Sequence, residues 1–370
     1  MTGQGPVTVG GFVDSLFKEF PLAWAEPWDR VGLVVGDANA PVRSILVTLD
    51  ADRATVRRAA DGGHDVVLTH HPAALDVELP LVAEGRTAVL VDALKAGIAL
   101  VSFHTNLDRS PLGAEALPRL LGMRVIEPLE AAQEPSTVIT TFAPLEVAEG
   151  LRTALAAAGA GRVGLYSACS FSSLGTGCYS APRGSKPVVG AVDSNMNEEV
   201  RIETTCSPEM TAAVISAIRA AHPYKEPLIT SVVGSVSRGV ARLGRLCELD
   251  TVETLLAFAS RCATSLEVDA RVWGDPERPI RRIGVGNGSA GSLIDRAIAL
   301  GADALLAGEV RYHDARAAID AGLSIVEAGH DATEWPLVHI LAQAAVAAVS
   351  GLAQVTEEDP SIAWWTTERH

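Results

Sequence analysis

Cysteine is scarce in this chain of 370 residues, and its few thiols follow no metal-binding or disulfide pattern. The five cysteines are Cys169, Cys178, Cys206, Cys247 and Cys262, and no two of them are spaced as Cys-x-x-Cys. An odd number without such a pair argues against a disulfide framework and against a zinc site built from thiolates. We therefore expect free thiols.

Basic residues are scarce as well. There are 30 Lys and Arg against 45 Asp and Glu, a formal charge of −15, which argues against a protein that binds nucleic acid through its phosphates. The first 30 residues lack the basic and apolar regions of a secretory signal. The Ala-rich segment 337–355 is interrupted by polar residues, so it predicts a packed helix, not a membrane span. We expect a cytoplasmic globular protein whose partner is a small molecule or another protein.

The chain is long enough for two or three domains of typical size. Apolar runs rich in β-branched residues alternate with helical patterns over the first third of the chain. We expect strands over 45–49, 65–69 and 98–103 and helices over 51–60 and 87–96. This alternation is typical of an α/β fold with a mostly parallel sheet, whose functional sites lie beyond the carboxyl ends of the strands.

The last third of the chain repeats the α/β pattern, with strands over 283–285, 304–306 and 324–327, helices over 292–300 and 312–321, and a long helix from Thr333. The middle is richer in Gly, Ser and Thr and suggests a small inserted α+β module. We therefore divide the chain into two halves of one α/β core, with mostly parallel sheets, and an insertion between them, at 1–132, 237–370 and 133–236.

Histidines gather where the predicted strands end. His70 and His71 follow the second strand, and His104 and Asp108 follow the third. Adjacent residues of a regular strand face opposite ways, so His70 and His71 serve one site only if the strand has already turned, which Pro72 favours, or if they flank separate metals. A single histidine at a strand end is more often a hydrogen-bonded structural residue than a ligand, but the coincidence of several favours a metal site.

His330 and Glu334 complete this pattern near the start of the last predicted helix. They are four residues apart and therefore share one helix face. Together with the strand-end residues they offer nitrogen and oxygen ligands, which suit zinc, iron or manganese better than calcium or magnesium. We expect two divalent metal ions per chain, held for hydrolysis of a small-molecule substrate.

Other motifs allow more than one interpretation. The segment 286–291 fits Gly-x-Gly-x-x-Gly, but no acidic residue follows at the distance that dinucleotide binding requires, so we favour a tight turn whose amides hold an anion. His313 is a candidate general acid or base, or a solvated helix residue. Trp28 and Asp29 are candidates for the rim of a cavity, although Trp28 could equally anchor the core.

Five motifs identify a resemblance that extends over nearly the whole chain. They are Trp28-Asp-Arg-Val-Gly-Leu33, Thr69-His-His-Pro72, His104-Thr-Asn-Leu-Asp108, Gly308-Glu-Val-Arg-Tyr-His313 and Gly329-His-Asp-Ala-Thr-Glu334. The sequence resembles the GTP cyclohydrolase 1 type 2 homologues, also called Nif-three-like dinuclear metal-centre proteins. Segments 170–177 and 222–227 are similar to the module inserted in the longer members, a ferredoxin-like domain similar to PII and CutA proteins.

The resemblance implies that His71 and Asp108 hold one cation, that His70 and His330 hold the other, and that Glu334 bridges them, with His104 close by. It also implies a homohexamer and a hydrolase acting on a nucleotide or phosphoester; the alternative is a regulatory protein that senses a ligand through its insertion. Arg30 stands where the family usually has Asn, and Glu309 stands where Asp is commoner. Glu309 and His313 are the candidate catalytic residues.

Overall fold

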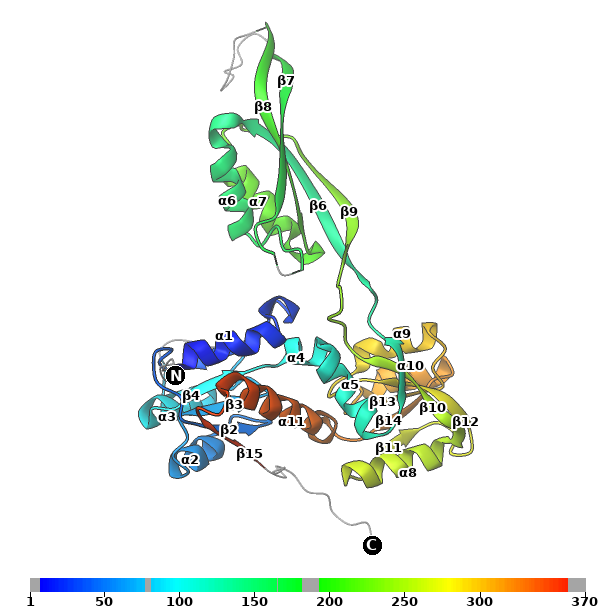
Figure 1. Ribbon diagram of the computed structural model, residues 1–370. Helices are drawn as coiled ribbons and strands as arrows, with labels where there is room; N and C mark the ends of the chain where they lie inside the picture. Colours follow the sequence, from blue (N-terminus) through cyan, green and yellow to red (C-terminus); the bar gives the residue numbers. More distant parts are fainter. Residues whose placement is uncertain (1–6, 77–80, 165, 182–192, 359–370) are drawn as a thin grey trace. The chain divides into compact units, whose positions relative to one another are not determined.

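The fold is a mixed α/β arrangement of three sheets, seen in a computed structural model that describes residues 7–76, 81–164, 166–181 and 193–358 (Figure 1). The chain separates into two compact units. The first, called the core unit below, consists of residues 1–131 and 240–370, and the second, the inserted unit, consists of residues 132–239. Two of the sheets belong to the core unit and one to the inserted unit.

The first sheet of the core unit has five strands in the order β1-β4-β3-β2-β15. Their bounds are β1 Gly32–Val35, β4 Ala99–Ser102, β3 Val66–Thr69, β2 Ser44–Thr48 and β15 Gln354–Glu357. Strand β1 pairs antiparallel with β4, and the other three pairings are parallel. Strands β2, β3 and β4 lie within two residues of the positions that the apolar runs predict.

Helices cover both faces of this sheet, which explains why its central strands are almost continuously apolar. Alternate strand residues such as Ile45, Val66 and Val101 pack against α1 (Val9–Glu19) and α11 (His330–Val349). Their neighbours along the strands pack on the opposite face against helices α2 (Arg53–Asp61) and α3 (Ala88–Ala96). The carboxyl ends of β2, β3 and β4 therefore remain as the free edge on which polar residues gather.

The second sheet of the core unit has six strands in the order β11-β14-β13-β12-β10-β5. They are β11 Arg271–Trp273, β14 Ser324–Glu327, β13 Ala304–Ala307, β12 Pro279–Val285, β10 Arg245–Thr254 and β5 Arg124–Pro128. Only the two pairings among β12, β13 and β14 are parallel; the other three are antiparallel. The expectation of mostly parallel sheets is wrong for this one, because the alternating pattern gave no sign of its flanking strands.

Helices also cover the second sheet on both sides. One side packs against α5 (Pro111–Leu120) and α8 (Leu255–Leu266), and the other packs against α9 (Ile294–Ala299) and α10 (Tyr312–Asp320). Short 3-10 helices lie at Leu22–Trp24, Gly85–Thr87, Leu145–Val147, Pro208–Met210 and Gly291–Leu293.

The inserted unit joins the core unit at two neighbouring strands, β5 and β10. These strands pair antiparallel, and the pairing continues beyond them through hydrogen bonds from Leu129 to Gly244 and from Glu130 to Leu243. The two ends of the insertion therefore leave the core unit side by side, where a simple hairpin turn would otherwise connect the strands.

The inserted unit is an antiparallel sheet with two helices on one face. Along the chain its elements are β6 Gln133–Pro144, α6 Ala148–Ala157, β7 Ser170–Ala181, β8 Asp193–Cys206, α7 Thr211–Ala221 and β9 Ile229–Ser237. The strand order is β7-β8-β6-β9, and every pairing is antiparallel. Apolar residues of both helices, among them Leu151 and Ile218, form its core with Ile139 and Ile202 of the strands.

Among the described residues, α11 is the one helix long and apolar enough to cross a membrane by length and composition. Half of that stretch is buried inside the structure, where Leu337, Leu341 and Ala345 pack against α1 and the first sheet. A buried core helix passes the same test of length and composition, and packing against β2 and α1 gives α11 that place in the fold.

Candidate metal centre

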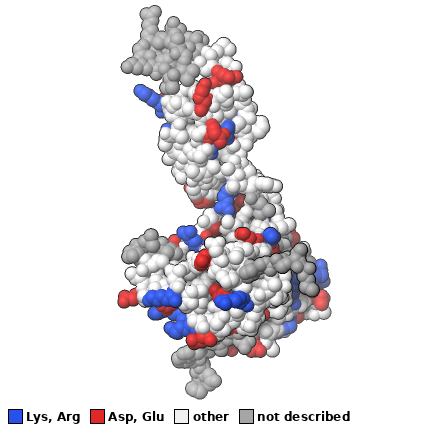
Figure 2. All heavy atoms as spheres, turned by 60° about the vertical axis from the view of Figure 1, so that its left-hand side comes forward, with Lys and Arg blue, Asp and Glu red and all other residues white. Residues whose placement is uncertain are grey.

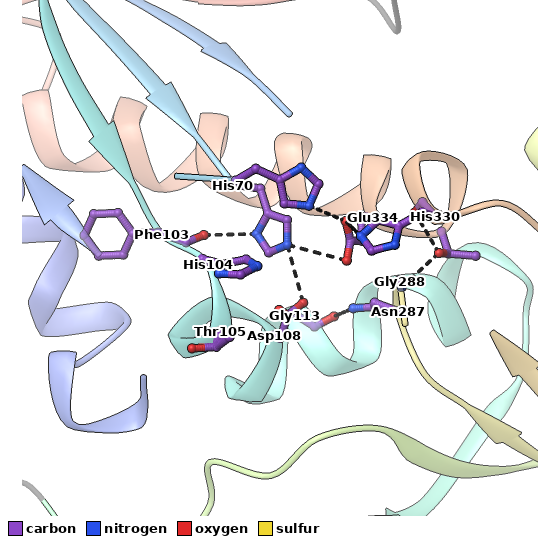
Figure 3. Close-up of polar contacts among 12 residues, drawn as sticks. His70, Phe103, His104, Thr105, Asp108, Gly113, Asn287, Gly288, His330 and Glu334 are labelled. Atoms are coloured by element: carbon purple, nitrogen blue, oxygen red, sulfur yellow. Dashed lines mark hydrogen bonds and ion pairs between the residues drawn. The ribbon is translucent and has the colours of Figure 1, made fainter. Parts of the chain in front are cut away.

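Two histidines follow the buried strand β3, where the chain has already left the sheet. His70 is fully buried, and its Nδ1 donates a hydrogen bond to the carbonyl oxygen of Phe103 at 3.0 Å (Figure 3). His71 is partly exposed, and its Nδ1 donates to Asp50 at 2.8 Å. Their ring centroids are 5.0 Å apart. Because the strand ends at Thr69, both rings can turn towards the same place.

His104 and Asp108 come from the loop and short helix α4 (Thr105–Arg109) that follow β4. The buried carboxylate of Asp29 accepts hydrogen bonds from His104 Nδ1 at 2.9 Å and from the Thr105 N–H at 3.0 Å. Burial raises the pKa of Asp29, but the bonds from His104 and Thr105 outweigh it and leave the pKa at about 2. Asp29 is therefore an ionised anchor for the His104 ring.

His330 and Glu334 stand one turn apart at the beginning of α11, which starts three residues earlier than the sequence pattern predicts. Glu334 is only 4% exposed, and its Oε2 lies 3.1 Å from His330 Nε2 and 2.8 Å from His71 Nε2. The other ring nitrogen of His330 faces the carboxylate of Glu309 at 3.4 Å. The last helix thus brings its two candidate ligands to the ends of strands β3 and β4.

One feature is common to the four histidines: each directs Nδ1 outward to an oxygen that can only accept a hydrogen bond. The proton of each neutral ring is therefore on Nδ1, and Nε2 presents its lone pair to the interior of the cluster. Histidine ligands of metals are commonly held in this way. When the rings are neutral, these lone pairs and the carboxylates of Asp108 and Glu334 form a donor set for cations.

The candidate ligand atoms fall into three groups, in each of which all atoms lie within 4.8 Å of one another. The groups are His70 with Asp108 and Glu334; His71 with His330 and Glu334; and His70 with His71 and His104. Glu334 belongs to the first two groups, as expected of a bridging carboxylate. The groups place His71 with His330 and His70 with Asp108, which differs from the division that the family resemblance implies.

Two buried polar atoms of the cluster accept or donate no hydrogen bond within the described residues. They are His70 Nε2 and Asp108 Oδ1, whereas Glu334 Oε2 lies within hydrogen-bond distance of the His71 and His330 rings. His70 Nε2 lies 3.7 Å from Asp108 Oδ1 and 3.8 Å from Glu334 Oε1, which is too long for a hydrogen bond (Figure 3). Leaving such groups buried and unpaired costs about 1–3 kcal/mol each, so a cation that they can coordinate fits this donor set.

The charges of the cluster are strongly coupled. Burial lowers the pKa of His71, but Asp50 and Glu334 outweigh it and raise that pKa to about 10. The bond to Glu334 raises the pKa of His330 to about 9 against the effect of burial. Burial raises the pKa of Asp108, whereas the neighbouring histidines hold the pKa of Glu334 well below its usual value. A metal ion must therefore displace protons from these rings.

The glycine-rich turn 286–291 lies against the same cluster. Gly288 has a φ of +51°, and a Cβ at this position would lie 2.0 Å from Glu334 Oε1. Its N–H donates to Thr333 Oγ1 at 3.0 Å, which ties the turn to α11. The amide of Gly288 is therefore not available to an anion, and the absence of a Cβ at this position leaves room for the Glu334 side chain.

The two candidate catalytic residues lie in different surroundings. Glu309 and His330 both line an open cavity of about 1760 Å³ next to the cluster. His313 is exposed on α10 beside Tyr312 and is not among the described residues that line this cavity. The geometry therefore places Glu309, but not His313, at the mouth of the candidate centre.

Sequence reasoning missed Asp50, which holds the ring of His71. The signal was present: Asp50 follows the strand predicted over 45–49, just as His70 and His104 follow the next two strands.

The two residues proposed for the rim of a cavity, Trp28 and Asp29, lie in different surroundings. Trp28 is 57% exposed and its ring centroid lies 6.0 Å from that of His104, so it is not a core anchor, while Asp29 is buried beneath His104.

Known proteins are similar to this chain over most of its length. The model of the Duf34/NIF3 (NGG1p interacting factor 3) family matches residues 7–357. Proteins named GTP cyclohydrolase 1 type 2 homolog are 32% identical, from Mycobacterium tuberculosis over 340 residues, 89% of each chain, and from Bacillus subtilis over 330 residues, 87% of this chain and 88% of the relative.

Solved structures show the same fold. The crystal structure of a Bacillus cereus protein related to NIF3 matches with a TM-score of 0.65 and 29% identity, over 98% of this chain and 100% of the other. A Staphylococcus aureus protein matches with a TM-score of 0.64 at 22% identity, over 99% of this chain and 100% of the other. The chain therefore belongs to the Duf34/NIF3 family.

Proposed function

We propose that the core unit binds two divalent metal ions and uses them to hydrolyse a small-molecule substrate. The observation that supports this most directly is the convergence of the Nε2 atoms of three histidines, His70, His71 and His330, on the carboxylates of Asp108 and Glu334. Two atoms of this set, His70 Nε2 and Asp108 Oδ1, have no hydrogen-bond partner within the described residues. The mixture of imidazole and carboxylate ligands suits zinc, iron or manganese. In this proposal the metal-binding residues are His70, His71, His104, Asp108, His330 and Glu334.

The side chains have distinct roles in this proposal. Glu334 belongs to two of the three sets of candidate ligands and would bridge the two ions, while Asp108 would bind one of them. Asp50 and Asp29 orient the His71 and His104 rings, and Glu309 is placed to receive a proton near His330. Two divalent ions held by these residues would lower the pKa of a water molecule and stabilise charge that develops on the substrate.

The substrate class comes from the family. Curated relatives are named GTP cyclohydrolase 1 type 2 homolog, so GTP is the first substrate to test, followed by other nucleotides and phosphoesters. The alternative is a regulatory protein that binds metals and a ligand without turnover.

The inserted unit and the assembly form the rest of the proposal. The order β-α-β-β-α-β with strands arranged β7-β8-β6-β9 supports a ferredoxin-like domain. Five free cysteines agree with a reducing compartment such as the cytoplasm. The homohexamer implied by the family resemblance can be tested by the mass of the protein in solution.

The experiment is a substrate screen with the metal-free protein reconstituted with zinc, iron or manganese. A hydrolase should turn over at least one nucleotide or phosphoester, lose that activity on chelation and regain it with metal. The Glu334→Ala variant should remain inactive at every metal concentration. Two bound metals with no turnover of any compound would reject the hydrolase and favour the regulatory alternative.

A further inference from the structure

The cavity beside the candidate metal centre has walls that select substrates by charge. It reaches the centre at His71 and His330, whose Nε2 atoms both contact Glu334. Its volume of about 1760 Å³ exceeds the roughly 300–1,000 Å³ of an ordinary ligand site. A substrate that approaches the two ions by this route must pass the side chains that line the walls.

Carboxylates dominate these walls. Two of them, Asp50 and Glu309, contact the histidines, Asp331 follows His330 in the chain, and Asp52 caps α2. Three more come from other elements, namely Glu267 and Asp269 after α8 and Glu357 of β15. The acidic residues therefore surround the cavity from several sides, and the field that they produce does not depend on a single rotamer.

Lysine and arginine together contribute a single positive charge to the described part of these walls. Arg119 is the one Lys or Arg among the described residues that line the cavity, and its Nη2 lies 2.7 Å from Glu115 of the same helix. With the histidines neutral, as metal binding requires of His71 and His330, seven carboxylates and one guanidinium give a formal charge of −6. Two divalent ions, reduced by the charges of Asp108 and Glu334, would contribute +2, so the loaded cavity keeps a formal charge of −4.

The face of the molecule seen in Figure 2 offers no ready alternative for anions. On the described part of the face in Figure 2, Lys and Arg lie in small groups separated by acidic and uncharged residues, not in a continuous basic patch. A polyphosphate that entered the cavity would lose part of its hydration and would be repelled by the carboxylates of the walls. Both effects weaken its binding unless cations accompany it.

The cavity also has an apolar part that suits a cation with a hydrocarbon body. Leu120, Leu266 and Val268 contribute aliphatic surface, and Trp335 and Ile340 contribute side chains from α11. A tryptophan ring is the best aromatic partner for an ammonium or guanidinium group, worth about 0.5–2 kcal/mol. Carboxylates around an apolar surface that contains Trp335 therefore match a ligand that is both cationic and partly apolar.

We propose that the substrate of this site carries a positive charge, an ammonium or guanidinium group, on an apolar body, and that the acidic walls disfavour nucleoside triphosphates. This inference rests on the proposed metal-dependent hydrolase, but it replaces the nucleoside triphosphate with a cationic substrate. The charged group of the substrate lies among the carboxylates near Glu267 and Asp269, while an oxygen or nitrogen atom at its other end reaches the metals.

Three hydroxamates of similar size test the charge preference, because the hydroxamate group binds the metals in each. The probes are the α-hydroxamates of Nα-acetyl-lysine, Nα-acetyl-norleucine and Nα-acetyl-glutamate, whose side chains are cationic, neutral and anionic. Calorimetric titration of the metal-loaded protein should give the tightest binding for lysine and the weakest for glutamate. We expect about a tenfold difference in Kd between these two at low salt, and a smaller one at high salt.

A double variant assigns the preference to the walls. Glu267→Gln with Asp269→Asn should reduce the advantage of the lysine probe at least about threefold and leave the metal content unchanged, because both residues are exposed and form no ion pair within the described residues. Asp320→Asn removes an acidic charge of α10 that does not line the cavity, and it should change nothing.

Each alternative result has a definite meaning. If the glutamate probe binds as tightly as the lysine probe to protein that holds two metals, the charge preference is wrong while the metal site stands. If no probe binds to such protein, the cavity does not lead to the metals and the inference is also wrong. Protein that binds no metal would overturn the proposed function, and this inference with it.

Discussion

At the scale of single residues, the position of one proton on each imidazole determines what the cluster can bind. Asp50, Asp29 and Glu309 are outside the group of candidate ligands, yet each accepts a hydrogen bond from the Nδ1 of one histidine. An imidazole with Nδ1 held in this way keeps its Nε2 lone pair directed at the metal position. These carboxylates therefore contribute to metal affinity without contacting a metal.

The Asp50→Ala variant tests this role. Removing the acceptor frees His71 to rotate and to change tautomer, so metal affinity should fall about 10–100-fold. The midpoint of thermal unfolding should change little, because the Asp50 side chain is 63% exposed. Competition with a chelator of known affinity measures the effect, and Asp320→Ala is the matched control. Unchanged affinity in Asp50→Ala would show that His71 needs no such anchor.

Metal binding should also release protons from the histidines. The pKa of His71 is raised to about 10 and that of His330 to about 9, so both rings are mainly protonated at neutral pH without metal. A metal ion displaces these protons, and its affinity should therefore rise as the pH increases from 6 to 8. Calorimetry in buffers with different ionisation enthalpies counts the released protons; an affinity independent of pH would contradict this account.

At the scale of elements, the close approach of the turn 286–291 to α11 shapes the centre. Gly288 leaves room for Glu334, and a Cβ on Gly308 would lie within 2.8 Å of the Gly288 carbonyl, Thr333 and His330. The turn therefore fits against the helix only because Gly288 and Gly308 have no side chains. Because this contact forms between elements far apart in the sequence, motif spacing alone could not reveal it.

The Gly288→Ala variant should displace Glu334 and abolish tight metal binding, since the added Cβ would lie 2.0 Å from Oε1. Gly63→Ala is the matched control: its φ is +69°, and nothing lies within 4 Å of an added Cβ. That substitution should cost about 1 kcal/mol of stability through backbone strain and leave the metals in place. Metal content and thermal unfolding of both variants separate strain from collision, and equal metal contents would refute the collision.

How well the sequence predicts each element depends on its burial. Strands β2, β3 and β4 are covered on both faces, so their continuous apolar runs were visible and their ends indicated His70 and His104. Strand β15 is short and half exposed, and the antiparallel flank β10 is long but polar in its second half, so neither carried that signal. The hydrogen-bond partners of the histidines depend on tertiary contacts, and spacing could not predict them.

At the scale of the whole molecule, the core unit holds every candidate ligand, and the inserted unit begins and ends on paired strands. The core unit therefore has its own hydrophobic cores and a complete candidate centre. Its connection to the insertion resembles an extended hairpin loop, a place where proteins commonly accept additional domains.

Replacing residues 132–239 with a two-residue turn should leave the core unit folded with the metal content of the full chain. The reason is that hydrogen bonds from Leu129 to Gly244 and from Glu130 to Leu243 already hold the two ends together. Circular dichroism, thermal unfolding and elemental analysis of the shortened protein check this. A shortened protein that folds but binds no metal would show that the inserted unit contributes to the centre.

The most direct test of the central claim is the metal content of the purified protein and two variants, measured by elemental analysis. We predict about two divalent metals per chain in the protein itself. Because Glu334 belongs to two of the three sets of candidate ligands, Glu334→Ala should lose both metals. The control His313→Ala alters a residue that does not line the cavity, and it should keep them. Full occupancy in Glu334→Ala would contradict a metal centre bridged by this carboxylate.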